Sequence, residues 1–205
     1  MEAPHYWANK VLTDGVTASD LTVSEPALIG WLHTLEATSQ LCMASARYRA
    51  AANYARRVLK AEGYPTRAAG TVLLALARLE DQDGFFALAH QLEEQVGADA
   101  LENSPWYLLA RTILLFKTNK MRPAARALRE FANRCEGGAF FLLNPMYQTP
   151  YLPCRPEPRD PWDLSHQAVW EADGIISDTP DFAPWANACE DVSQLAQEFA
   201  RRYGF

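Results

Sequence analysis

The side chains best suited to chemistry in this sequence lie between Asp160 and Asp173. His166 and Asp163 stand three residues apart, so on a helix they would share one face. An imidazole and a carboxylate placed in this way could ligate one divalent metal ion. Helix capping by Asp160 and a favourable interaction of Asp163 with the helix dipole explain these two aspartates without a metal. A metal-dependent enzyme with a site near His166 is therefore an alternative hypothesis.

Other sequence signatures of catalysis do not occur. The chain has no glycine-rich phosphate loop, no HExxH or GxSxG motif and no CxxC pair. Its four cysteines lie far apart, which favours reduced thiols over disulfides or a zinc site. The sequence thus predicts no catalytic residue, no metal ligand and no cofactor, and we expect a protein that is not an enzyme.

Length and composition narrow the class of protein. A chain of 205 residues with 49% hydrophobic residues is long enough for one sizeable core. The net charge of −6 argues against a general nucleic-acid binder, because phosphate neutralisation needs a basic surface. No apolar run approaches the ~18 residues of a membrane span, and the start MEAPHYWANK lacks a secretory signal pattern. We expect a cytoplasmic protein without membrane insertion.

Charge is distributed along the chain in blocks of alternating sign. Blocks of this kind are informative about surfaces rather than about the fold. The basic blocks are residues 45–60 and 117–134, and the acidic blocks are residues 79–102 and 157–198.

Three segments share one helical pattern. They are SARYRAAANYARRVL from Ser45, QDGFFALAHQLEEQV from Gln82 and TNKMRPAARALREFA from Thr118, and they begin at nearly equal intervals along the chain. Apolar residues recur in steps of three and four, the spacing of one helix face. The aligned sets are Tyr48, Phe85 and Met121, then Ala51, Leu88 and Ala124, then Ala55, Leu92 and Leu128. Small residues beside that face (Ala52, Ala89 and Ala125) would let a neighbouring helix approach closely.

Each of these segments follows another helical stretch after a short polar break. The preceding stretches are SEPALIGWLHTLEATSQLCMA, PTRAAGTVLLALARL and SPWYLLARTILLFK; the second begins with proline, and the third has proline directly after Ser104, a possible cap. The sequence therefore predicts an all-α fold of three antiparallel helical hairpins. A plain helical bundle is the alternative.

The pattern resembles the tetratricopeptide repeat (TPR) family over about residues 25–136. The second helix of that motif has an aromatic residue, an alanine three later and a large residue four beyond, which Tyr48, Ala51 and Ala55 match in part. The turn LFKTNKM also matches the family in length and character, whereas the period of this chain is longer than that of the family. The resemblance implies a short right-handed solenoid, with a concave surface lined mainly by the first helix of each hairpin.

The resemblance also implies which residues line that groove. A mixed apolar and charged lining suits a peptide or a partner helix. We expect Trp106 to be the main anchor, with a core role as the alternative. The groove residues are His33, Glu36 and Gln40 in the first hairpin, Leu73, Ala77 and Glu80 in the second, and Trp106, Leu109, Ile113 and Lys117 in the third.

The two ends of the chain do not repeat. We expect residues 1–24 to be an N-terminal extension with a short helix, and residues 137–205 to be a proline-rich acidic segment that belongs to the same globular unit. Eight of the thirteen prolines lie in 145–184, so we expect extended chain there and a helix from about Asp160. A final helix over about 184–202 should cap the third hairpin through Val192, Leu195 and Phe199. The extended stretch 145–161 is expected to cross the groove or its rim, as a built-in competitor for the partner.

The function that these observations favour is that of a non-enzymatic scaffold or adaptor for protein–protein interaction. It would bind another protein or peptide in the concave groove, within a multi-subunit complex. A self-assembling structural subunit, which would be a homo-oligomer, is a second hypothesis besides the enzyme.

Overall fold

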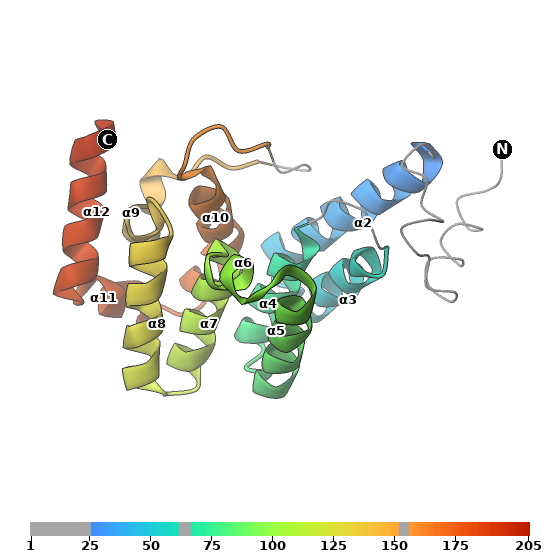
Figure 1. Cartoon of the computed structure of the whole chain (residues 1–205), viewed down its shortest axis with the longest axis horizontal. Helices are drawn as coiled ribbons and strands as arrows, with labels where there is room; N and C mark the ends of the chain where they lie inside the picture. Colours follow the sequence, from blue (N-terminus) through green and yellow to red (C-terminus); the bar gives the residue numbers. More distant parts are fainter. Residues whose placement is uncertain (1–25, 62–66, 152–155) are drawn as a thin grey trace.

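The structure is a computed structural model that describes residues 26–61, 67–151 and 156–205 (Figure 1). The predicted N-terminal extension therefore lies outside the described residues. Within these ranges the regular elements are all helical, which confirms the all-α class. The helices are α2 (Pro26–Ala44), α3 (Tyr48–Leu59), α4 (Ala68–Arg78), α5 (Gln82–Val96), α6 (Ala98–Glu102), α7 (Pro105–Lys117), α8 (Met121–Arg134), α9 (Gly138–Leu143), the 3-10 turn η1 (Pro145–Tyr147), α10 (Asp163–Ser177), α11 (Phe182–Asn187) and α12 (Glu190–Tyr203).

The turns α2–α3, α4–α5 and α7–α8 share one geometry. Each contains one non-glycine residue in the left-handed region, two residues before the second helix: Ala46 (φ 55°), Glu80 (φ 59°) and Asn119 (φ 57°). In each turn the backbone N–H of the left-handed residue donates to the carbonyl three residues earlier. The backbone N–H of the following residue donates to the carbonyl five residues earlier. This is the hydrogen-bond pattern of a Schellman motif at a helix C-terminus. The three hairpins are therefore equivalent at their turns.

These turns set a register that differs from the one predicted from the sequence. The interval from Ala46 to Glu80 is shorter than the interval from Glu80 to Asn119. The short helix α6, five residues long, accounts for the longer second interval. The middle hairpin is shifted by three residues, so that Phe85 rather than Leu88 is the equivalent of Ala51. Both alignments keep the same face of the helix, since helical faces recur every three or four residues.

The buried faces of the second helices mostly follow the predicted pattern. Ala51, Ala55 and Ala124 are fully buried, as close helix packing requires, and Phe85 is buried at the same position in α5. Leu88, Leu92 and Ala125 are only partly buried, and Met121, the first residue of α8, is 38% exposed.

Helix α4 lies at the centre of the molecule and packs on both α3 and α7. Its residues 70–77 are all buried. Gly70 faces the Trp106 indole of α7 so closely that a Cβ atom at Gly70 would lie 2.4 Å from the indole Cγ. The missing side chain thus allows α4 and α7 to approach each other.

The part after α8 packs back onto the hairpins. Helix α10 contacts α7, α9, α2 and α4, and α12, at one end of the molecule, contacts α9 and α8 (Figure 1). The single final helix predicted over 184–202 is instead two helices, α11 and α12, because the backbone is extended at Cys189. Val192, Ala196 and Phe199 form the buried face of α12. An ion pair between Arg129 and Asp191 further joins α12 to α8.

Candidate functional site

The structure gives His166 and Asp163 partners near the start of α10. Asp163 Oδ2 accepts the backbone N–H groups of Arg159 (2.6 Å) and Asp160 (2.9 Å). His166 Nε2 accepts the backbone N–H of Thr149 (2.9 Å), and burial lowers the pKa of this imidazole. Both side chains therefore hold backbone that precedes α10. Across the described ranges, no three His, Cys, Asp or Glu side chains form a group suited to a metal ion.

The face formed by α2, α4 and α7, the first helices of the three hairpins, is called the first-helix face below. The left-handed turn residues align these three helices with one another. In this alignment the groove residues predicted for the first hairpin are equivalent to those predicted for the third, so that His33 corresponds to Trp106. In the middle hairpin the equivalent positions hold Arg67, Gly70 and Leu74, whereas the prediction named Leu73, Ala77 and Glu80.

Helix α10 covers the first-helix face. Its residues Ala168, Val169, Ala172 and Ile175 are completely buried, in agreement with its contacts to α2, α4 and α7. A helix that buries such a stripe of small and branched side chains is held mainly by the hydrophobic effect.

A buried carboxylate fixes the position of α10 on this face. The Trp106 indole Nε1–H donates to Glu171 Oε2 (2.9 Å), and the Tyr151 hydroxyl donates to Glu171 Oε1 (2.8 Å). Trp106 is 5% exposed and Glu171 is 8% exposed. A buried carboxylate needs such donors, because burial without them is costly. Trp106 thus binds a helix of its own chain.

Two arginines that the sequence analysis missed also bind α10. Arg67 donates to the Gln167 side chain (2.6 Å), and Arg78 forms an ion pair with Asp178 (3.4 Å) just after α10. The Tyr48 hydroxyl donates to the same carboxylate (3.2 Å), and burial together with Asp178 raises the pKa of Tyr48. The sequence pattern alone did not point to either arginine, because only the turn register of the structure makes Arg67 equivalent to Trp106 and Arg78 equivalent to Lys117.

The predicted groove residues therefore occupy different environments. Lys117 pairs with Glu80 (3.2 Å) beside the turns. Glu36 and Lys117 are half-buried, whereas His33 and Glu80 are exposed. The buried ones are Gln40, Leu73, Ala77, Trp106, Leu109 and Ile113. The predicted occupant, the stretch 145–161, contributes Tyr151, but the face itself is filled by α10, which follows that stretch. Residues 152–155 of the stretch lie outside the described residues.

An open cleft remains at the edge of the first-helix face. It lies between the C-terminal half of α2 and α10 and has a volume of about 170 Å³. Such a volume holds roughly five water molecules at ~30 Å³ each, enough for one or two side chains. We call it the α2–α10 cleft; its lining is Gln40, Met43, Ala44, Trp170, Glu171, Asp173 and Gly174.

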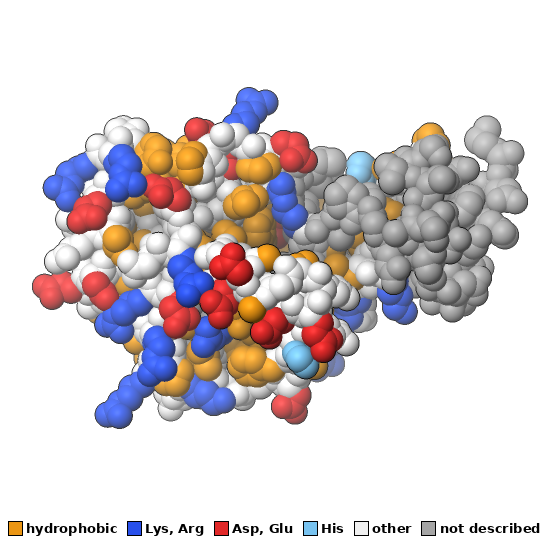
Figure 2. Space-filling model, viewed as in Figure 1, with side chains coloured by type: hydrophobic (Ala, Val, Ile, Leu, Met, Phe, Trp, Pro, Cys, Tyr) orange, Lys and Arg blue, Asp and Glu red, His pale blue; other side chains and the backbone are white. Residues whose placement is uncertain are grey.

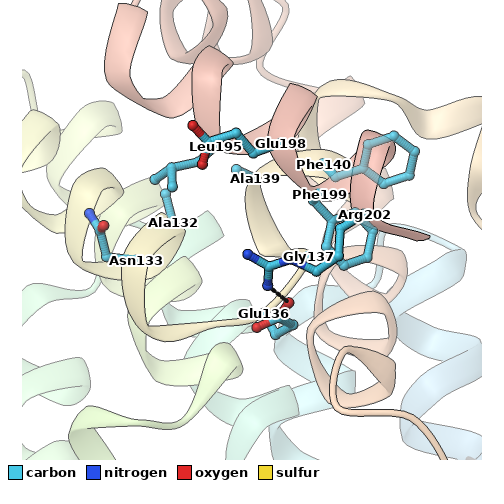
Figure 3. A pocket seen from close by; sticks show the side chains of 10 residues that line it. All are labelled: Ala132, Asn133, Glu136, Gly137, Ala139, Phe140, Leu195, Glu198, Phe199 and Arg202. Atoms are coloured by element: carbon cyan, nitrogen blue, oxygen red, sulfur yellow. Dashed lines mark hydrogen bonds and ion pairs between the residues drawn. The ribbon is translucent and has the colours of Figure 1, made fainter. Parts of the chain in front are cut away.

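A second cleft of about 180 Å³ lies where α12 meets the α8–α9 junction (Figure 3). Glu136 and Arg202 point toward each other in it and form an ion pair of 2.9 Å. The Tyr203 hydroxyl donates to the same Glu136 carboxylate (3.3 Å). Since these charges neutralise each other, this cleft is best explained as a packing seam that holds α12 in place.

Comparisons with known proteins leave the family undetermined. No family model matches the chain, and no curated protein and no solved structure matches it significantly. In the ranges that the structure describes, none of the helices has both the length and the apolar character needed to cross a membrane. The TPR-like assignment therefore stays a prediction from the residue pattern.

Replacing Trp106 with phenylalanine is expected to lower the free energy of unfolding by about 1–3 kcal/mol. The change keeps an aromatic ring but removes the donor to Glu171 Oε2, a buried acceptor. Chemical denaturation monitored by circular dichroism measures the effect. Trp185→Phe is the matched control, because Trp185 packs on Phe116 and Phe182 without donating to another described residue. Equal losses in both variants would contradict a specific role of the indole N–H.

Proposed function

We propose that the chain is a non-enzymatic scaffold for protein–protein interaction, built as a short right-handed TPR-like solenoid. The extended proline-rich segment completes the concave side of the solenoid, and the last helix completes its end. The observation that carries this proposal is that the first helices of three equivalent hairpins together hold a helix, α10. A face that recognises one helix through an apolar stripe and a few polar anchors is suited to helical or extended peptides.

Three features support the TPR-like arrangement. The three turns have equal geometry. The interval between the first two turns equals the repeat length of the TPR family, and the next interval is longer by the length of α6. The small residues Ala51, Ala55 and Gly70 lie where neighbouring helices meet. Each feature follows from equivalent hairpins that stack on one another.

We place the partner at the α2–α10 cleft, next to the helix that the protein already holds. Displacement of α10 would expose four completely buried apolar side chains, at a cost of several kcal/mol. Binding beside α10 avoids that cost. The cleft offers an indole surface at Trp170, so a peptide that inserts an apolar side chain fits it. The partner is then another protein in a cytoplasmic complex.

A glycine in the cleft provides the test. Gly174 is exposed, and a Cβ atom there would have only ordinary contacts, the nearest at 3.8 Å. Gly174→Arg therefore adds a Cβ atom without a clash and a long charged side chain at the cleft, and it should slightly raise the helix propensity of α10. Proteins captured by the tagged full chain from its native cells would be compared by cross-linking and mass spectrometry. We expect this variant to capture at least about tenfold less of the partner, which corresponds to a loss of ~1.4 kcal/mol in binding free energy.

The matched control is Gly30→Arg on α2. Gly30 is exposed, and no atom of the described residues lies within 4 Å of its Cβ position, so the variant adds the same charge and side chain outside the cleft. The partner should be retained with this control. Equal capture by the two variants would exclude the α2–α10 cleft as the binding site.

A further inference from the structure

The outward faces of α3 and α5 carry opposite charges at two of three equivalent positions, and at the third an arginine of α3 corresponds to a histidine of α5. One, eight and twelve residues after the first residue of α3 stand Arg49, Arg56 and Lys60, all exposed. The same positions of α5 hold Asp83, His90 and Glu94, also exposed. We call these residues the basic stripe and the acidic stripe. Because the two helices begin in the same way after equivalent turns, the stripes have the same spacing.

Neither stripe is neutralised by the rest of the described chain. Arg49, Arg56 and Lys60 form no ion pair with another described residue, and the same is true of Asp83. Among the described residues Glu94 forms an ion pair with His90 of its own helix alone (3.7 Å), and the two side chains are 68% and 73% exposed. By contrast, Arg129 at the same position of α8 is paired with Asp191.

The acidic stripe lies beside exposed apolar surface. Helix α5 packs mainly on α4 and α6, and only Phe85 and Ala89 of its side chains are buried. Phe86, three residues after Asp83, is 44% exposed. Figure 2 shows Asp and Glu side chains gathered around α5 and α6, with hydrophobic side chains between them. Exposed apolar groups rimmed by charge are typical of interaction surfaces.

We propose that a second copy of this chain docks here, with the basic stripe of one copy on the acidic stripe of the other. Charge complementarity carries the proposal, because both halves of the contact are present on every chain. A two-fold arrangement makes the contact twice, since each copy supplies one α3 and one α5. Two such contacts, each of which covers Phe86, bury more surface area than a single helix pair, as a stable dimer requires. The stripes lie outside the α2–α10 cleft, so this dimer does not depend on the function proposed above.

The test is the oligomeric state of the full chain by light scattering and sedimentation. Wild type should dimerise at about 50 mM salt, and at about 500 mM the dissociation constant should rise at least about tenfold, because exposed charges are screened. Arg49→Glu with Lys60→Glu gives a chain whose two stripes are both acidic. Asp83→Lys with Glu94→Lys gives a chain whose two stripes are both basic. Each variant alone should be a monomer, and an equal mixture of the two should form a heterodimer.

The control changes the same kind of charge elsewhere. Arg122→Glu with Arg126→Glu lies on the exposed face of α8, and it should leave the dimer unchanged. Circular dichroism and melting temperatures verify that every variant is folded, since such surface changes usually alter stability by less than about 0.5 kcal/mol each. A wild-type monomer at about 100 μM and low salt would overturn the proposal, as would a dimer that the stripe variants leave intact. Binding of a basic peptide to a monomeric chain through α5 would overturn it too, and would assign the acidic stripe to another partner.

Discussion

A chain that ends at Glu136 is expected to lose its cooperative thermal transition and to aggregate where the full chain stays in solution. The deletion removes α10, whose four completely buried side chains cover α2, α4 and α7, and it removes α12 from α8. Burying a large apolar side chain contributes about 1.5–3 kcal/mol, so the loss is several kcal/mol. Whole domains are stable by only about 5–15 kcal/mol. The shortened chain should therefore be largely unfolded at room temperature.

Differential scanning calorimetry and dye binding to exposed apolar surface measure this effect. The control is a chain that lacks only Phe205, a 42%-exposed residue at the edge of the aromatic cluster around Phe140 and Phe199. It should lose less than about 1 kcal/mol, in line with a partly exposed side chain. If the chain that ends at Glu136 melts at the same temperature as the full chain, α10 and α12 do not stabilise the hairpins.

Replacing Gly70 with alanine should destabilise the protein by about 1–3 kcal/mol, although alanine is the better helix former. The new methyl group would lie 2.4 Å from Cγ and 2.8 Å from Cβ of Trp106. Neither atom is the flexible end of a side chain, so α4 and α7 must move apart. In a chain of this size the melting temperature should fall by about 2–4 °C for each kcal/mol.

The matched control is Gly30→Ala in α2. Among the described residues nothing lies within 4 Å of its Cβ position, so the substitution should raise stability by up to about 1 kcal/mol through helix propensity alone. Two glycine-to-alanine changes within first helices should thus have opposite signs. A stabilised Gly70→Ala variant would mean that the contact between Gly70 and Trp106 does not determine the distance between α4 and α7.

The sequence by itself determined the helical hairpins. Proline and Ser104 mark the start of α7, and the Ser104 side chain indeed accepts the backbone N–H of Tyr107. The alanines at Ala51, Ala55 and Ala124 predicted close helix contacts, and they are fully buried. These features are local, since caps and one-sided apolar spacing act within a few residues and leave a direct trace in the sequence.

Only the tertiary structure decided the register of the middle hairpin and the occupant of the first-helix face. A three-residue shift leaves the same side of α5 apolar, so its periodicity could not choose between Leu88 and Phe85 as the equivalent of Ala51. Contacts such as that between Trp106 and Glu171 join residues 65 positions apart, and no short-range pattern encodes them. The apolar stripe of α10 predicts that this helix is covered by another part of the protein. Which helices cover it depends on the packing of the whole chain, because the hydrophobic effect acts without regard to sequence distance.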